Sequence, residues 1–246
     1  MKFKLYKKSE IFIICPANID TGGPMCLHQL AYKLKKKFKK KVHMYYFPTS
    51  LKNPIHKNYR SLKIPFKKKI PDIKKNILII PEYYPAVEIS EKYKNIQKGL
   101  WWLSVDFYLY HRFIYKNHSI LRSLIKLPYK IMKIINQLLF FQFKNLSLFK
   151  YLRLIYLNIP FYNVFKINNI HINLVHSYYQ YITLKNKNIN STYLSDSINS
   201  EYVKVGKKIS LKNKKNIICF NPRKSSSFFD RFVKLNPDIK FIPIIG

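Results

Sequence analysis

The sequence contains few acidic residues, few cysteines and few glycines. Only 11 of its 246 residues are Asp or Glu, against 46 Lys or Arg, which gives a formal net charge of +35. A surface this positive favours anionic partners such as phosphates, phospholipid headgroups or nucleic acid. The accompanying abundance of Asn, Ile, Tyr and Phe is typical of an AT-rich genome and accounts for part of the lysine. It does not account for the shortage of acids.

The cysteines are too few and too scattered for a disulfide framework or a zinc site. Cys15, Cys26 and Cys219 form no Cys-x-x-Cys pair, so we expect a reducing, cytoplasmic setting. No apolar run approaches the roughly 18 residues of a membrane-spanning helix. The basic and then apolar amino terminus has too short an apolar stretch for a signal peptide, and is better interpreted as a first buried strand.

Several catalytic motifs are also missing. The sequence contains no Asp-x-Asp, no His-x-x-x-His and no Gly-x-Ser-x-Gly. Metal-dependent sugar transfer, zinc hydrolysis and serine-esterase chemistry therefore have no support, and we expect neither a metal nor another cofactor.

What is present predicts an α/β fold. Hydrophobic residues make up 48% of the chain, enough for a folded core. Short apolar runs separated by helix-length segments indicate buried parallel strands, at Ile11–Cys15, Val42–Phe47, Ile77–Ile80, Trp101–Val105, Leu174–His176 and Tyr193–Leu194. Helical spacing over Met25–Leu34 follows the first strand. The fold class is α/β, with a Rossmann-like parallel sheet.

The chain divides into two predicted domains. Residues 1–204 form the first, residues 205–215 a lysine-rich linker, and residues 216–246 a single βαβ unit that starts a second. Within the first domain, residues 107–170 are a basic helical insertion, and no acid occurs between residues 107 and 195.

Three lysines of the insertion share one helical side: Lys126, Lys130 and Lys133. With Ile, Leu and Phe elsewhere on the helix, they predict an interfacial helix that docks on an anionic membrane surface. The alternative is a helix that packs on the sheet with a solvated lysine side.

A glycine pair lies between the first strand and the first helix. Gly22 and Gly23 would let the backbone approach a ligand at the helix amino terminus, where unpaired N–H groups favour a phosphate or a sugar. The alternative is an ordinary tight turn.

Six segments in order carry a resemblance to a known family. They are TGGPMCLHQLAYKL, ILIIPEYYP, GLWWLSVDFY, VHSYYQYI, STYLSDSIN and NIICFNPRKS. Together they resemble bacterial glycosyltransferases of the two-Rossmann-domain (GT-B) type, in the group-1 branch that builds surface polysaccharides. The resemblance covers most of residues 11–106 and 171–245. It implies transfer of a sugar from a nucleotide-sugar to a glycan or lipid-linked acceptor, at the inner face of the membrane.

The resemblance also implies roles for particular residues. Glu82 and Asp106 would contact sugar hydroxyls or accept a proton, and each could instead be a cap. His176 and Ser177 would add polar contacts at the end of another strand, although His176 could simply be a partly buried histidine.

In the second domain, Arg223 and Lys224 would hold the donor diphosphate. The alternative is that they are surface residues with no role in binding. The family's late acidic motif is missing before Gly246, which implies that a complementing donor-domain chain is needed or that the chain alone is inactive. The alternative function is a non-catalytic basic protein that binds membranes or nucleic acid.

Overall fold

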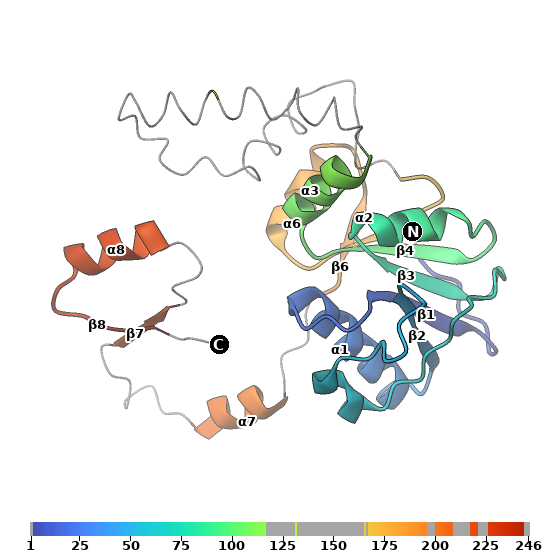
Figure 1. Cartoon of the computed structure of the whole chain (residues 1–246), viewed down its shortest axis with the longest axis horizontal. Coiled ribbons are helices and arrows are strands. Elements are labelled where there is room, and N and C mark those ends of the chain that lie inside the picture. Colours follow the sequence, from blue (N-terminus) through green and yellow to red (C-terminus); the bar gives the residue numbers. More distant parts are fainter. Residues whose placement is uncertain are drawn as a thin grey trace. The chain divides into compact units, whose positions relative to one another are not determined.

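The computed structural model describes residues 2–116, 131, 165, 167–195, 200–208, 217–220 and 226–243. The chain forms two compact units, Met1–Ser197 and Ile198–Gly246. Figure 1 shows the elements of both units in sequence colours.

The first unit is built on a six-stranded sheet in which every neighbouring pair is parallel. The strand order is β2-β1-β3-β4-β5-β6. The strands are β1 (Glu10–Pro16), β2 (Lys41–Phe47), β3 (Ile77–Pro81), β4 (Gln97–Trp102), β5 (Ile172–Val175) and β6 (Ser191–Tyr193). The connecting helices are α1 (Gly22–Lys36), the 3-10 helix η1 (Lys57–Leu62), α2 (Tyr84–Glu91), α3 (Val105–Lys116) and α6 (Tyr178–Lys185). This is the predicted α/β, Rossmann-like architecture.

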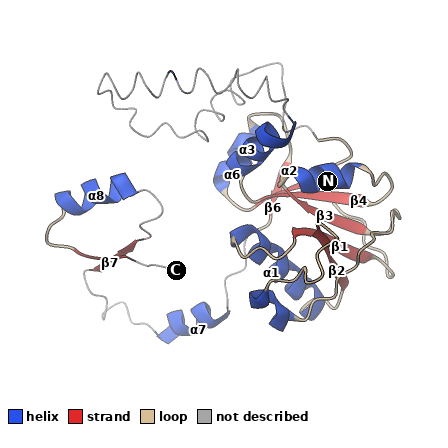
Figure 2. Ribbon diagram, in the orientation of Figure 1, coloured by secondary structure: helices blue, strands red, loops and turns tan. Residues whose placement is uncertain are grey.

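The two faces of the sheet carry separate hydrophobic cores. Along β1, Phe12 and Ile14 belong to one core, whereas Ile11 and Ile13 belong to the other. Helices α2, α3 and α6 cover the first face, and α1 covers the second (Figure 2). Because both faces are buried, β1, β2 and β3 are largely apolar along their length instead of alternating between apolar and polar residues.

The predicted strand at Trp101–Val105 is wrong at both ends. Strand β4 begins four residues earlier and ends at Trp102, and Val105 already starts α3. The chain leaves the sheet because the Leu103 N–H donates to the Glu82 carboxylate and the Phe107 N–H to the Ser104 hydroxyl. The Ser104 contact is a typical helix cap. Asp106 therefore lies in the first turn of a helix.

The other boundaries shift by fewer residues. Helix α1 begins at Gly22, three residues before the prediction, so the glycine pair belongs to the helix and not to a loop. Strand β5 ends at Val175, one residue before His176, and β6 ends at Tyr193.

The second unit contains the predicted βαβ arrangement. Strand β7 (Ile217–Phe220), helix α8 (Ser226–Leu235) and strand β8 (Lys240–Pro243) follow in order, and the two strands are parallel. Helix α7 (Ser200–Lys208) precedes them, so the predicted linker at 205–215 begins inside a helix.

Of the predicted basic insertion, residues 107–116 belong to α3, whose Tyr108, Leu109 and Phe113 side chains are buried in the core. Lys126, Lys130 and Lys133 lie outside the described residues, and their docking on a membrane stays a prediction.

Candidate functional site

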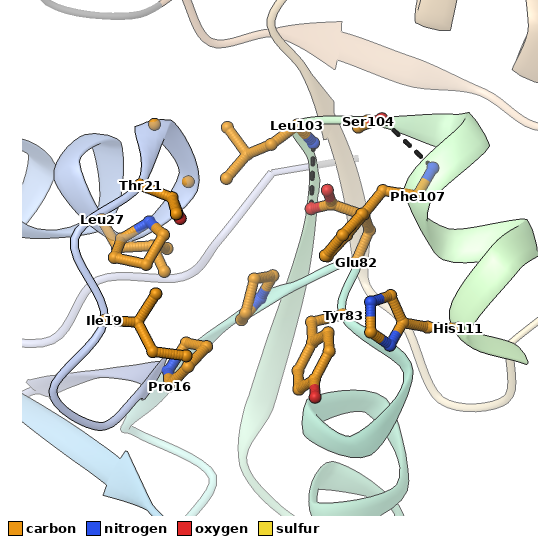
Figure 3. A pocket seen from close by; sticks show the side chains of 14 residues that line it. Pro16, Ile19, Thr21, Leu27, Glu82, Tyr83, Leu103, Ser104, Phe107 and His111 are labelled. Carbon is orange, nitrogen blue, oxygen red and sulfur yellow. Dashed lines mark hydrogen bonds between the residues drawn. The ribbon is translucent and has the colours of Figure 1, made fainter. Parts of the chain in front are cut away.

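A pocket of about 400 Å³ opens at the carboxyl edge of the sheet. It lies where the chain order reverses, since β1 has β2 on one side and β3 on the other. Ligands of open α/β sheets bind in the crevice outside the carboxyl ends of the strands at this switch point. The lining residues are Pro16, Ile19, Thr21, Gly22, Gly23, Pro24, Leu27, Pro81, Glu82, Tyr83, Leu103, Ser104, Phe107 and His111 (Figure 3).

One wall of the pocket is the amino terminus of α1. Thr21 precedes the helix with extended backbone and makes no capping hydrogen bond through its side chain, and the first turn contains no acid. The first helical N–H groups therefore have no side-chain cap from Thr21. Neither Gly22 nor Gly23 has a positive φ, so their contribution is space and not an unusual backbone conformation. A Cβ on Gly23 would lie 3.7 Å from the Leu103 side chain, across the pocket.

A buried hydrogen-bond network holds this wall in place. His28 Nδ1 lies 2.7 Å from the Pro24 carbonyl oxygen, and Nε2 lies 2.8 Å from the Tyr46 hydroxyl. The His28 ring stacks on the ring of Tyr59. The Tyr59 hydroxyl donates a hydrogen bond of 2.5 Å to the carboxylate of Asp20, in the loop between β1 and α1. Burial lowers the pKa of His28, so its ring is neutral at neutral pH.

Glu82 is the acid of the pocket. Its side chain is only 4% exposed, and Oε2 accepts the Leu103 N–H at 3.1 Å. Burial raises its pKa to about 7, against the opposing effect of backbone N–H groups that include those of Leu103 and Ser104. The carboxyl group therefore exchanges a proton near neutral pH while also holding the turn between β4 and α3.

The opposite wall is aromatic. The Tyr83 ring lies 4.5 Å from the His111 ring and 6.0 Å from the Phe107 ring, and Phe107 and His111 are 4.2 Å apart, all measured between centroids. Figure 3 shows these side chains across the pocket from α1. His111 Nδ1 is buried without a hydrogen-bond partner among the described residues, and burial lowers the pKa of the ring.

The pocket differs electrostatically from the rest of the molecule. Among the described residues that line it, none is Lys or Arg, although 46 such residues occur in the chain. Three smaller or comparable hollows elsewhere on the first unit each contain at least three lysines. The pocket thus suits a largely neutral ligand with an apolar face, and not a polyanion.

Three of the predicted site residues come together in the pocket, and three described ones do not. Gly22, Gly23 and Glu82 all line it. Asp106 does not, and its carboxylate accepts a hydrogen bond from the Tyr179 hydroxyl at 3.1 Å. This bond joins α3 to α6.

His176 and Ser177 follow β5 but also lie outside the lining. His176 Nδ1 lies 3.4 Å from the Trp102 carbonyl oxygen, and Ser177 caps α6 in a capping box with Gln180. Arg223 and Lys224 lie outside the described residues.

Sequence reasoning missed the apolar side of the pocket. Ile19, Tyr83, Leu103, Phe107 and His111 were not predicted as site residues. One signal was available, since Phe107 and His111 are four residues apart and a helix places such residues on one face. That signal was not used, because residues 107–170 were interpreted as a basic helical insertion separate from the site.

Neither a metal site nor a membrane span is found among the described residues. They contain no group of three or more His, Cys, Asp or Glu side chains that could hold a metal ion. No helix within them has the length and apolar character needed to cross a membrane.

Similarity to known proteins gives no further information about the site. No protein-family model matches the chain, and no curated protein or solved structure is significantly similar to it. The function must therefore be argued from the pocket.

Proposed function

We propose that this chain is a glycosyltransferase of the GT-B type and that the pocket binds the acceptor of the transfer. The observation that carries the proposal is the composition of the pocket, which pairs a proton-exchanging carboxyl group with an aromatic wall and has no Lys or Arg among its described lining residues. A neutral sugar ring has the matching chemistry, because its C–H face packs on aromatic rings and its hydroxyls need polar partners.

The proposed reaction uses Glu82 as general base. Its carboxylate takes the proton of the acceptor hydroxyl while the oxygen attacks the anomeric carbon of the nucleotide-sugar. The bond from that carbon to the diphosphate breaks, and the nucleoside diphosphate leaves with the electron pair. The raised pKa of Glu82, about 7, suits this role. A base whose pKa is near the working pH is deprotonated in a large share of the molecules and is still basic enough to accept the proton.

The donor belongs to the second unit in this proposal. Arg223 and Lys224 follow β7 in the sequence and would offset the diphosphate charge by charge-assisted hydrogen bonds. The sugar acceptor is a glycan or lipid-linked molecule of bacterial surface polysaccharide synthesis, and no metal takes part.

The test combines binding and turnover. Saturation-transfer NMR against neutral mono- and oligosaccharides should detect binding to the full chain, and Phe107→Ala should abolish the signal. Release of nucleoside diphosphate from nucleotide-sugar, measured with a bound acceptor, should fall at least about 100-fold in Glu82→Gln because the base is lost. The matched control is Glu88→Gln, which removes an exposed acid of α2 outside the pocket.

Two outcomes contradict the proposal. If no neutral sugar binds while DNA binds in a salt-sensitive manner, the chain is a nucleic-acid-binding protein. If Glu82→Gln and Glu88→Gln have equal turnover, Glu82 is not the base.

A further inference from the structure

The amino edge of the same sheet carries a second hollow, of about 380 Å³. Its lining residues are Lys4, Tyr6, Lys74, Lys94, Asn95, Gln97 and His171. They come from the segments that enter β1, β3, β4 and β5, so the hollow lies at the opposite end of the strands from the pocket. The amino terminus of the chain runs beside β4 here (Figure 1).

Hydrogen bonds from two side chains, Gln97 and Asp72, fix the backbone beneath the three lysines. The Gln97 side chain accepts the Lys4 N–H at 2.7 Å and donates to the carbonyl oxygens of Lys4 (2.8 Å) and Lys74 (3.2 Å). The Asp72 carboxylate accepts the N–H groups of residues 94, 95 and 96 at 2.8 to 2.9 Å. The charge of Asp72 is thereby directed to the backbone, while the Lys4, Lys74 and Lys94 side chains are exposed.

Large apolar side chains stand exposed in the same segments. Leu5 is 54% exposed, Tyr6 37% and Ile73 46%. Leu5 and Ile73 are each next to a lysine of the hollow in the sequence, and Tyr6 itself lines the hollow. The segment is anchored by Phe3, whose ring occupies the space above Gly99. Water is a poor environment for these apolar side chains, but the boundary between lipid headgroups and acyl chains suits them.

We propose that this edge of the sheet docks on an anionic phospholipid membrane. A headgroup phosphate would lie among Lys4, Lys74 and Lys94, with the three apolar side chains at the acyl boundary. Charge complementarity selects an anionic surface, and the exposed apolar side chains select a lipid over a nucleic acid. This docking does not depend on sugar transfer, and it uses a surface other than the predicted helix with Lys126, Lys130 and Lys133.

Co-sedimentation of the full chain with vesicles tests the proposal. Vesicles that contain phosphatidylglycerol should bind the protein, and pure phosphatidylcholine vesicles should not. Replacing Lys4, Lys74 and Lys94 with Gln should weaken binding about 100-fold, because each lysine near an anionic surface contributes about fivefold. The matched control replaces Lys33 and Lys36 of α1 and the following Lys37, which are also exposed, and should lose less than about threefold. Leu5→Ser with Ile73→Ser should weaken binding about tenfold or more.

Three results would overturn the proposal. Equal losses in the two triple variants would mean that net charge alone attracts the protein to vesicles. No binding to anionic vesicles at low salt, with native circular dichroism, would exclude a membrane partner. Competition by glycerol 3-phosphate, with no effect of the Leu5 and Ile73 changes, would assign the hollow to a free phosphate ester. Sugar binding at the pocket is measured separately, so these failures leave the proposed function untouched.

Discussion

At the scale of single residues, the buried carboxyl group of Glu82 links the candidate site to stability. Its pKa is raised from the usual 4.5 to about 7, chiefly by burial. The folded state therefore holds this proton more tightly than the unfolded state, and the contribution of Glu82 to stability falls as the pH rises from about 4.5 through 7. The size of this loss is on the order of 3 kcal/mol.

Glu82→Gln should remove that loss. We expect the variant to be more stable than the wild type at about pH 8, and to lose the advantage at about pH 5, where Glu82 is protonated in the folded state. Urea unfolding at both pH values measures the difference. The histidines titrate in both proteins, so comparing the two isolates Glu82. The same advantage at both pH values would mean that the carboxyl group does not change its protonation in this range.

At the scale of an element, the glycine pair at the start of α1 leaves space in the pocket and does not supply an unusual backbone conformation. A Cβ on Gly23 would meet only the Leu103 side chain, at the ordinary contact distance of 3.7 Å, and neither glycine needs a positive φ. A larger side chain at this position would therefore fill the pocket without straining the backbone.

We expect Gly23→Val to abolish sugar binding while the free energy of unfolding stays within about 1 kcal/mol of the wild type. Saturation-transfer NMR and urea unfolding measure the two quantities. The matched control is Gly206→Val, because Gly206 is also a helical glycine and has nothing within 4 Å of an added Cβ. Retention of sugar binding in Gly23→Val would place the ligand outside the pocket.

At the scale of the whole molecule, the hydrophobic core belongs to the first unit. Among the described residues, every buried hydrophobic side chain lies between Ile11 and Leu184, within the unit Met1–Ser197. The pocket lies there too. The described residues of the second unit form α7 and one βαβ arrangement, and a single βαβ arrangement is too small to bury a sizeable core.

A fragment of residues 1–197 should therefore fold alone. We expect a cooperative thermal transition close to the main transition of the full chain, and unchanged sugar binding. Scanning calorimetry and saturation-transfer NMR provide the measurements. A fragment that lacks near-ultraviolet circular dichroism would show that the core needs the second unit.

The sheet illustrates how far pattern reasoning extends. Five of the six strands of the first unit were located to within two residues at both ends. The apolar pattern was clearest for β1, β2 and β3, because parallel strands that are buried on both faces are largely apolar. Strand β4 was displaced because it opens with Gln97, Lys98 and Gly99, which interrupt the apolar pattern. Gln97 is accommodated by hydrogen bonds to Lys4 and Lys74, residues distant in the sequence, and no local pattern reports such partners.

The sequence by itself determined the α/β class, the excess of positive charge, the place of Gly22 and Gly23 between the first strand and the first helix, and that of Glu82 just after the third strand. Only the tertiary structure decided that these three residues share one pocket with Tyr83, Phe107 and His111, while Asp106, His176 and Ser177 serve as packing or capping contacts. It also decided that the pocket has no Lys or Arg among its described lining residues. The physical reason is that burial and proximity depend on contacts between distant segments, and these contacts set both the pKa of Glu82 and the neutrality of its surroundings.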